Sequence, residues 1–419
     1  MEKALLVSIQ LKTDRGLWRI EDISSELEEL ALSSSVEVVE NIICICQKAT
    51  ANYLIGKGKV EEISVIANEA GIDTVIFSHD LSGTQQRNLE KALGLKTIDR
   101  TQLILDIFSR RAKSPEGKMQ VELAQLQYLL PRLTGKGIML SNLGAGIGTR
   151  GPGETRLEID RRQIRKKIDK LKDDLKTFRL HRQTMRKRRK SNNLPVVALV
   201  GYTSAGKSTL LNLLTKSVQI TSEKLFTTLD PLAKSLQLSN GQNIIISDTV
   251  GFLHELPHHL IEAFKATLEE VIEADLLIHV LDVADQRLYQ HNQAVQSVLG
   301  ELGANDLPMF VALNKIDLIE DRSWLEISKN DFGESVFISA KTGENLKALI
   351  SKIEEYFSGF MLSLKIIIPH ARMELVDFFY RKAKVNKIDY LQEGIRIDLS
   401  ISRQLYNKIS EDRDIKIIY

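Results

Sequence analysis

The sequence predicts an α/β fold in which a P-loop domain follows a small α/β domain and a helical, coiled-coil hairpin and precedes a small α+β domain. Three observations support this prediction. Strand-like and helix-like segments alternate in residues 1–113 and 194–357, as in α/β domains. Apolar residues recur at heptad spacing within residues 114–191, as in helices packed along a narrow seam. A Gly-rich turn ending in Gly-Lys-Ser joins an apolar strand to a helix near residue 200.

Length and composition are those expected of a soluble protein with several domains. The chain has 419 residues, 43% of them hydrophobic and 27% charged, which is enough for two to four domains. No apolar run approaches the ~20 residues of a membrane span. The N-terminal segment lacks the pattern of a secretory signal and is interpreted as a first strand, so we expect a cytoplasmic protein with no membrane span.

Residues 1–113 are predicted to form a small, largely parallel α/β domain. The segments predicted as strands are residues 4–11, 36–46, 73–78 and 96–99. Amphipathic segments at residues 60–70 and 84–93 are predicted as helices, and Ser82 is the expected N-cap of the second.

Two local features of this domain each allow two interpretations. Cys44 and Cys46 are too close for a disulfide framework and too few for a zinc site, so buried, inert thiols are expected. Gly56, Lys57 and the two residues that follow stand at a helix start. Their spacing would suit an anion site or a solvated turn, and we favour the turn.

Residues 114–191 are predicted to form a helical hairpin with a Gly-rich tip and a basic second arm. The tip, residues 134–153, contains seven of the 24 glycines, so we expect it to be mobile until it binds something. Two apolar stripes predict the arms. Their members are Met119, Leu123, Leu126, Leu130 and Leu133 in the first arm, and Ile164, Ile168, Leu171, Leu175 and Phe178 in the second.

The basic charge of the chain is concentrated in the second arm. Residues 161–190 contain fifteen Lys or Arg and three Asp, whereas the whole chain has a net charge of only +2. A solvated face followed by a flexible basic linker would explain part of this excess. Contact with a nucleic acid explains more of it, and the scarcity of aromatic residues favours recognition of backbone and shape over base stacking.

The predicted phosphate-binding loop follows a strand at residues 196–200. Glycines let the backbone curl so that its amides face phosphate oxygens, and the helix that follows adds the positive end of its dipole. Lys207 is expected to reach the outer phosphates, and Ser208 to bind Mg²⁺ directly. The residues assigned to the loop are Gly201, Tyr202, Thr203, Ser204, Ala205, Gly206, Lys207, Ser208 and Thr209.

Four downstream segments complete a guanine-nucleotide site, each placed after a predicted strand or in a loop between strands. Asp248 can hold Mg²⁺ through water, and the Gly251 amide can contact a terminal phosphate. Asp317 can accept hydrogen bonds from N1 and the exocyclic amine of guanine, which adenine does not offer. The order of these segments predicts a P-loop GTPase domain at residues 194–357 that binds GTP and GDP and hydrolyses GTP. The nucleotide-contact residues are Asp248, Thr249, Val250, Gly251, Asn314, Lys315, Asp317, Ser339, Ala340 and Lys341.

Two positions bear on hydrolysis. A mobile segment that includes Phe226, Thr227, Thr228, Leu229 and Asp230 offers two threonines as a further Mg²⁺ ligand. Phe252 follows the glycine of the Asp-x-x-Gly motif, where many small GTPases carry a Gln that orients water. We therefore expect slow intrinsic hydrolysis. The catalytic residue is unknown from sequence, and a partner or another residue is expected to complete the site.

Residues 361–419 are predicted to form a small α+β domain. Its expected elements are a strand at 362–368, a helix at 371–382 and two strands near 388–391 and 395–399.

With these motifs in view, the chain resembles the HflX family of translation-associated GTPases over nearly its whole length. The segments that carry the resemblance are YLIGKGKVEEI at 53–63, EGKMQVELAQLQYLLPRLTGKG at 116–137 and GIGTRGPGETRLEIDRR at 146–162. The nucleotide motifs GYTSAGKSTLLN, LFTTLDP, DTVGF, NKID and SAKTG also resemble those of the family.

The resemblance implies GTP-dependent binding to the large ribosomal subunit, splitting of stalled or idle ribosomes, and a hairpin tip that reaches toward the peptidyl-transferase region. It also places the direct Mg²⁺ ligand of the mobile segment at Thr228. Ser204 departs from the Asn that many members carry, which bears on potassium dependence. The residues proposed to contact rRNA are Lys136, Arg150, Arg156, Arg161 and Arg162.

Two other functions remain open at this point. An assembly or hibernation GTPase would bind the large subunit without splitting ribosomes. A protein-binding regulator would use the hairpin to hold another protein. Nothing in the sequence demands more than a monomer off the ribosome.

Overall fold

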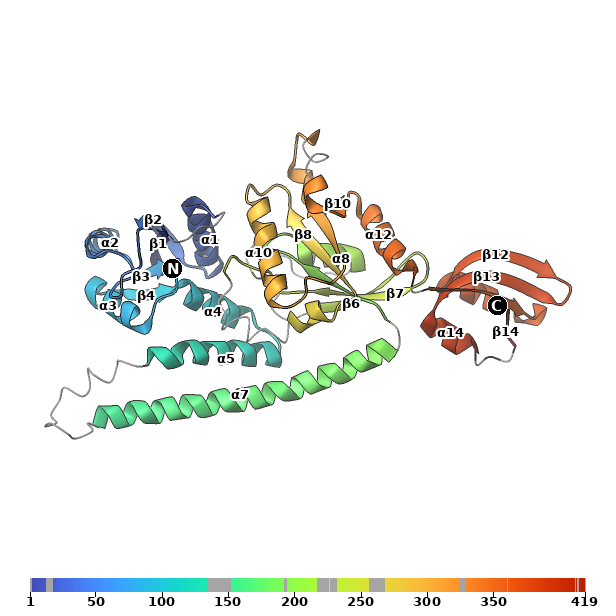
Figure 1. The fold of residues 1–419 in the computed structure, drawn as a ribbon, viewed down its shortest axis with the longest axis horizontal. Helices are drawn as coiled ribbons and strands as arrows, with labels where there is room; N and C mark the ends of the chain where they lie inside the picture. Colours follow the sequence, from blue (N-terminus) through green and yellow to red (C-terminus); the bar gives the residue numbers. More distant parts are fainter. Residues whose placement is uncertain are drawn as a thin grey trace.

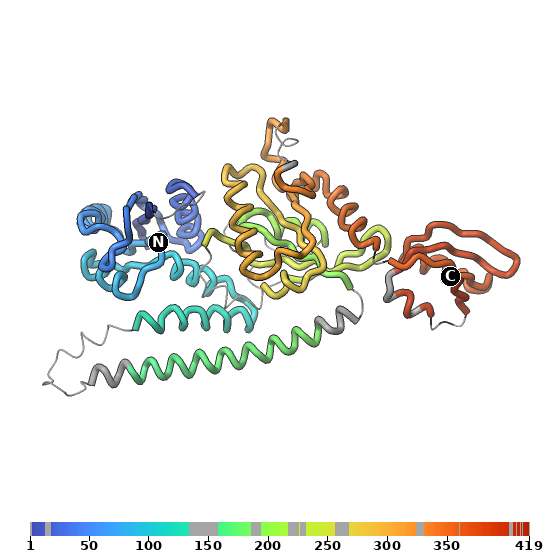
Figure 2. Tube along the Cα trace, viewed as in Figure 1, coloured from blue at the N-terminus to red at the C-terminus, as the bar shows by residue number. Residues whose placement is uncertain are grey.

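The protein is described by a computed structural model that covers residues 2–12, 18–133, 152–191, 194–216, 226, 232–255, 268–323, 329–359, 361–410, 412 and 414–418. Three sheet-containing units lie in a row, and the helical hairpin runs beneath the first two of them (Figure 1). The tube view follows the same path and shows the C-terminal unit at the opposite end from the N-terminal one (Figure 2). In the described part of the chain, no helix combines the length and the apolar character needed to cross a bilayer.

The N-terminal unit is a four-stranded parallel sheet in the order β2-β1-β3-β4. Its strands are β1 (Lys3–Leu11), β2 (Glu37–Cys46), β3 (Thr74–Phe77) and β4 (Lys96–Asp99). Side chains of alternate strand residues face opposite sides, so each face needs a helical cover. One face packs against α1 (Ile20–Ser33) and α4 (Arg100–Arg111), and the other against α2 (Lys57–Glu69) and α3 (Gly83–Leu93).

The predicted strands of this unit are confirmed, whereas α1 and α4 were not predicted. Ser82 caps α3 as expected, because its side chain accepts a hydrogen bond from the Gln85 amide. Gly56 is the N-cap of α2, and the lysine side chains nearby form ion pairs with Glu61 and Glu62 on the same helix. Cys44 is buried, and burial raises the pKa of its thiol to about 11.

The predicted hairpin is formed by α5 (Pro115–Arg132) and α7 (Pro152–Ser191), which lie side by side (Figure 1). Leu123, Ile168 and Leu171 are buried in their seam, and further members of the two stripes pack around them. Ser114 caps α5, and Pro115 occupies the first turn, where a missing amide costs nothing. Helix α7 continues through the basic run to Ser191, so this run is helical rather than a flexible linker. Residues 134–151 of the tip lie outside the described residues.

The central unit is a six-stranded sheet in the order β10-β9-β8-β5-β7-β6. Its strands are β5 (Val196–Val200), β6 (Leu232–Gln237), β7 (Asn243–Asp248), β8 (Leu276–Asp282), β9 (Met309–Asn314) and β10 (Ser335–Phe337). Helices α8 (Lys207–Thr215) and α12 (Leu346–Ser358) cover one face, and α10 (Leu288–Glu301) covers the other. Only β6 is antiparallel among these strands, so the other five end at one edge, where an α/β sheet places its ligand.

The C-terminal unit is an antiparallel sheet in the order β12-β13-β11-β14. Its strands are β11 (Met361–Ile368), β12 (Lys384–Leu391), β13 (Gly394–Ser402) and β14 (Lys416–Ile418). Helices α13 (Glu374–Lys382) and α14 (Arg403–Ser410) bury apolar residues against it. The predicted α+β character is confirmed, and α14 and β14 extend the prediction.

The buried seam predicts that Leu171→Ala separates the arms of the hairpin. Loss of a buried leucine side chain typically costs about 2–5 kcal/mol, and no other sheet or helix covers this seam among the described residues. We expect limited proteolysis within α7 to become faster. Leu180→Ala on the same helix is the control, since Leu180 is 63% exposed. Equal cleavage rates for the two variants would contradict a packed seam.

Candidate nucleotide-binding site

The phosphate-binding loop joins β5 to α8 and depends on two glycines. Gly201 has φ 152° and Gly206 has φ 97°. A Cβ on Gly201 would lie 2.3 Å from the Val280 carbonyl oxygen, and a Cβ on Gly206 would lie 2.3 Å from Asn314 Nδ2. The loop therefore packs directly against β8 and the side chain of Asn314, and larger residues at these two positions are excluded.

Lys207 is buried at the start of α8 and folds back over the loop. Its Nζ donates hydrogen bonds to the carbonyl oxygens of Gly201 at 3.0 Å and Tyr202 at 2.7 Å. Burial lowers the pKa of this lysine to about 8, and the nearby Asp248 carboxylate opposes the shift. The contacts hold the ammonium group against the backbone carbonyls of the phosphate-binding loop.

Ser208 and Asp248 form the pair of oxygen groups that suits Mg²⁺. The Ser208 hydroxyl donates to Asp248 Oδ2 at 2.6 Å, although the two residues come from α8 and β7. Asp248 is fully buried, and a hydroxyl next to a carboxylate matches the hard oxygen ligands that Mg²⁺ prefers. The residues present therefore fit this ion. The predicted Thr227, Thr228, Leu229 and Asp230 lie outside the described residues.

Asn314 at the end of β9 connects the phosphate-binding loop to the segment after β10. Its Nδ2 donates to the Ala205 carbonyl oxygen, and its Oδ1 accepts from the Ala340 amide, both at 2.8 Å. Asp317 Oδ1 accepts from the Ser339 hydroxyl at 2.6 Å. Lys315 Nζ lies 2.6 Å from Asp282 Oδ2 at the end of β8. The structure thus brings together the segments predicted to surround a guanine base, and their side chains already contact one another.

Phe252 does not face the phosphate-binding loop with its side chain. It is 1% exposed and packs in the core between the sheet and α10, with Ala198 and Val200. Its backbone amide donates to the Gly201 carbonyl oxygen at 3.1 Å, and its carbonyl oxygen accepts from the Thr203 amide at 2.9 Å. The position at which many GTPases carry a water-orienting Gln is therefore occupied here by a buried apolar side chain.

The N-terminal unit contributes side chains to the site, which the sequence did not reveal. Tyr202 in the phosphate-binding loop donates its hydroxyl hydrogen to Glu26 of α1 and accepts from the His254 amide at 2.9 Å. Its ring stacks on that of His291 at 3.8 Å. Phe226 is buried, and its ring packs edge-to-face against Phe108 of α4 at 4.5 Å.

A cavity of about 370 Å³ beside the phosphate-binding loop is likewise lined by residues of both the N-terminal and the central unit. Residues 202–205, Asp282 and Lys315 line one side of it, and Glu29 and Ser33 of α1 line the other. Arg287 spans the gap, because its Nη2 lies 3.1 Å from Glu29 and 3.0 Å from Asp285. Helix α1 therefore closes one flank of the candidate nucleotide site. No local motif predicts this contact, because Glu29 and Arg287 are 258 residues apart along the chain.

Four family descriptions match consecutive parts of the chain. They are a GTP-binding GTPase N-terminal region at 21–109, a GTP-binding GTPase middle region at 111–189, a 50S ribosome-binding GTPase at 196–315 and an HflX C-terminal domain at 327–414. GTPase HflX of Caldanaerobacter subterraneus subsp. tengcongensis is 43% identical over 97% of this chain and 93% of its own length. The chain belongs to the HflX family of GTPases. It is accordingly a P-loop GTP hydrolase.

Other relatives extend the same result. GTPase HflX of Escherichia coli K12 is 38% identical over 96% of this chain and 93% of its own length. Among solved structures, a GTP-binding protein of Sulfolobus solfataricus in complex with GDP is similar at 25% identity, with a TM-score of 0.44 over 85% of this chain and 98% of the other. The two HflX relatives, which are 38% and 43% identical over nearly the whole chain, confirm the resemblance inferred from the sequence motifs.

The packing of Gly251 predicts that Gly251→Ala reduces hydrolysis more than GDP binding. A Cβ there would lie 2.9 Å from Thr203 Cα and 3.2 Å from Lys207 Nζ, so the loop would have to move. We expect kcat for GTP to fall at least about tenfold, because displaced catalytic groups lose their alignment. Gly359→Ala is the control, since nothing lies within 4 Å of its Cβ position. Unchanged turnover in Gly251→Ala would contradict the close approach.

His291 predicts an acid-sensitive junction between the N-terminal and central units. Burial lowers the pKa of its imidazole to about 4, and Asp285, Glu26 and Asp22 oppose that shift while Arg287 adds to it. A histidine whose pKa is lowered on folding contributes its full stabilisation of the folded state at pH values above its pKa in the unfolded state, about 6.5. This contribution is lost as the pH falls from about 6.5 to 4. Burial of a neutral histidine here thus makes the unfolded state bind more protons in that range.

We expect His291→Gln to reduce the pH dependence of the free energy of unfolding by up to about 3 kcal/mol between pH 7 and pH 4. Trp18 reports on the junction, since its ring lies 5.8 Å from that of His291. Denaturant unfolding would therefore be followed by Trp18 fluorescence in a Trp324→Phe background. His181→Gln, at an exposed position on α7, is the control. Identical pH profiles for His291→Gln and its parent would refute the buried neutral imidazole.

Proposed function

We propose that this GTPase binds the large ribosomal subunit in its GTP-bound state and separates stalled or idle ribosomes into subunits. The observation that carries the proposal is the exposed basic face of α7, on the long second arm of the hairpin. Arg162, Arg165, Lys166, Lys170 and Lys172 are exposed and form no ion pair among the described residues. Such a face suits a polyanion, and the family match describes a 50S ribosome-binding GTPase.

The other cations of α7 have a structural role. Lys167 and Arg182 pair with Glu122 and Glu116 on α5, and Arg179 lies 3.1 Å from Glu269. These pairs hold α7 against the first arm and the central unit. The unpaired cations are thus presented by a helix that is itself fixed in place. Of the predicted rRNA contacts, Arg161 is half-buried and Arg162 exposed, the Arg156 side chain is not described, and Lys136 and Arg150 lie outside the described residues.

In the proposed nucleotide site, the loop from Gly201 to Thr209 holds the phosphates, and Asp317 reads guanine with Asn314 and residues 339–341 as its support. Mg²⁺ would be held by Ser208 and Thr228 directly and by Asp248 through water, and it would neutralise charge on the phosphate oxygens. Lys207 would leave its contacts with loop carbonyls to bind phosphate. Gly251 would report on the terminal phosphate, because it packs against Thr203 and Lys207.

Hydrolysis in this proposal is completed by a group outside the nucleotide motifs. The Phe252 side chain is committed to the core, so the chain lacks a polar group at the usual water-orienting position. A partner contact would supply or order such a group, and hydrolysis would then release the GTPase. This arrangement links a slow intrinsic rate to stimulation by the partner.

The test is GTP hydrolysis with and without purified large ribosomal subunits at two salt concentrations. We expect strong stimulation that weakens as salt rises, because phosphate contacts release counterions. The triple variant Arg162→Gln/Lys166→Gln/Lys170→Gln should bind the subunit with a weaker salt dependence. The slope of the logarithm of the binding constant against the logarithm of the salt concentration should fall in magnitude by about 2–3, at about 0.7–0.9 per lost phosphate contact. The control is Arg381→Gln/Lys382→Gln/Lys384→Gln, at exposed positions of the C-terminal unit.

Sedimentation of whole ribosomes with GTP or GDP then separates splitting from simple binding. GTP-dependent release of subunits that is lost in Lys207→Ala would support the proposal. Binding without subunit release would instead indicate an assembly or hibernation factor. Stimulation that is absent at both salt concentrations would refute the large subunit as the partner.

A further inference from the structure

Two consecutive residues at the junction of β4 and α4 contact different functional parts of the chain. Asp99 is the last residue of β4 and the N-cap of α4, and Arg100 is the first residue of α4. The Asp99 side chain is directed toward the end of α5, where the hairpin tip begins. Arg100 is directed toward the segment that follows the Asp248–Gly251 motif.

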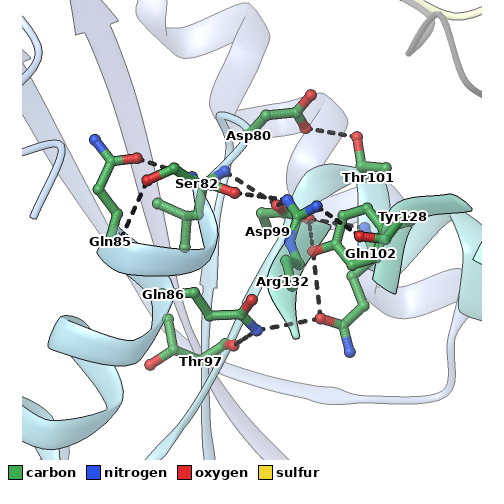
Figure 3. Close-up of polar contacts among 11 residues, drawn as sticks. Asp80, Ser82, Gln85, Gln86, Thr97, Asp99, Thr101, Gln102, Tyr128 and Arg132 are labelled. Carbon is green, nitrogen blue, oxygen red and sulfur yellow. Dashed lines mark hydrogen bonds and ion pairs between the residues drawn. The ribbon is translucent and has the colours of Figure 1, made fainter. Parts of the chain in front are cut away.

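Asp99 fixes the end of the first hairpin arm. Its carboxylate is fully buried and accepts four hydrogen bonds, as Figure 3 shows in part. The donors are the amides of Leu81 at 3.0 Å and Gln102 at 2.8 Å, the Tyr128 hydroxyl at 2.8 Å and Arg132 Nη2 at 2.9 Å. Burial raises the pKa of Asp99, and these donors compensate part of the cost of burying its charge. Helices α4 and α5 and the segment just before α3 therefore meet at one carboxylate.

Arg132, the last residue of α5, adds further contacts at this point. It donates to the Leu81 carbonyl oxygen at 2.6 Å and to the Tyr128 carbonyl oxygen at 3.0 Å. Its guanidinium lies 3.4 Å from the centre of the Tyr128 ring. A Cβ on Gly83 would lie 3.1 Å from Arg132 Cα, so the helices approach closely here. The C-terminal end of α5 is thus held in place by the N-terminal unit.

Arg100 holds the backbone after the Asp-x-x-Gly motif. It donates to the carbonyl oxygens of His254 at 2.5 Å and Glu255 at 3.0 Å. It also pairs with Glu26, which in turn accepts the hydroxyl hydrogen of Tyr202. The side chains of Arg100 and Glu26 are only 12% and 6% exposed. One buried ion pair from the N-terminal unit thereby contacts both the phosphate-binding loop and residues 254–255.

These contacts hold the Asp248–Gly251 motif close to the phosphate-binding loop. Gly251 already lies against Thr203 and Lys207, and the Phe252 backbone is paired on both sides with the loop. Arg100 anchors the carbonyl groups of His254 and Glu255, so the segment cannot move away from the loop without losing two charge-assisted hydrogen bonds. Order at this position is what a terminal phosphate and its attacking water require.

We propose that Arg100 is a positioning residue for GTP hydrolysis. In this proposal the adjacent residues Asp99 and Arg100 couple the C-terminal end of α5, at Tyr128 and Arg132, to the segment after Gly251. Coupling of this kind is reciprocal: a nucleotide that reorders residues 254–255 changes the stability of the α5 terminus, and a ligand on the hairpin changes the nucleotide site. The inference does not depend on which partner the hairpin binds.

The first test uses Glu26→Gln/Arg100→Met, which removes the buried pair without leaving a lone charge. The amide oxygen that this variant places at position 26 can still accept from Tyr202. We expect kcat for GTP without any partner to fall about tenfold while the Kd for GDP changes less than about threefold, since alignment rather than binding is lost. Arg110→Met is the matched control, because Arg110 lies on the same helix and donates to the Ser34 carbonyl oxygen at 2.6 Å. A higher kcat, or an equal loss of GDP affinity, would overturn the positioning role.

The second test measures coupling by backbone hydrogen exchange, again without ribosomes. In the parent protein, a non-hydrolysable GTP analogue with Mg²⁺ should slow exchange at residues 128–133 relative to GDP. This difference should disappear in Glu26→Gln/Arg100→Met and persist in Arg110→Met. If the parent shows no difference at residues 128–133, or if the double variant retains it, the coupling is refuted. Failure here would leave the proposal about the large ribosomal subunit untouched, because no partner is present.

Discussion

The buried ion pair between Glu26 and Arg100 is the interaction on which the arrangement of the first two units depends. Burying two charges costs several kcal/mol per ion, so such a pair persists only when its remaining donors and acceptors are satisfied. Here Tyr202, His254 and Glu255 provide those partners. Burial alone would raise the pKa of Glu26, but Arg100 and the Tyr202 hydroxyl, together with His254, bring it below its usual value. The partners that satisfy the pair belong to the candidate nucleotide site, so the packing of the first two units and the geometry of that site depend on the same contacts.

The central sheet explains why the nucleotide motifs meet where they do. Parallel strands β5, β7, β8 and β9 end at one edge, and the phosphate-binding loop, Asp248, Asp282 and Asn314 lie at their ends. Asn314 then contacts both the Ala205 carbonyl oxygen and the Ala340 amide, which links the phosphate side of the site to the base side. Phe252 does not take part in these contacts with its side chain, because it is part of the core beneath this edge.

The hairpin combines a fixed base with a charged surface. Its seam is narrow, and ion pairs from α7 to α5 and to Glu269 add to the contacts between the arms and the central unit. At the other end of α5, Arg132 is held by Asp99 and Leu81. An arm anchored at both ends can transmit a displacement, whereas a flexible basic linker would only attract phosphate through its charge. The helical continuation of α7 through residues 186–190 favours the first of these roles.

The sequence by itself determined the P-loop site, the order of the nucleotide motifs, the heptad seam and the strands of the N-terminal unit. Each of these rests on local spacing: Gly201 to Ser208 is one continuous loop, and the seam repeats every three or four residues. Only the tertiary structure decided the roles of Glu26, Asp99 and Arg100, the burial of Phe252, and the position of α1 against the cavity beside the loop. The physical reason is that a buried polar contact is defined by its partner, and here the partners are up to 258 residues apart along the chain.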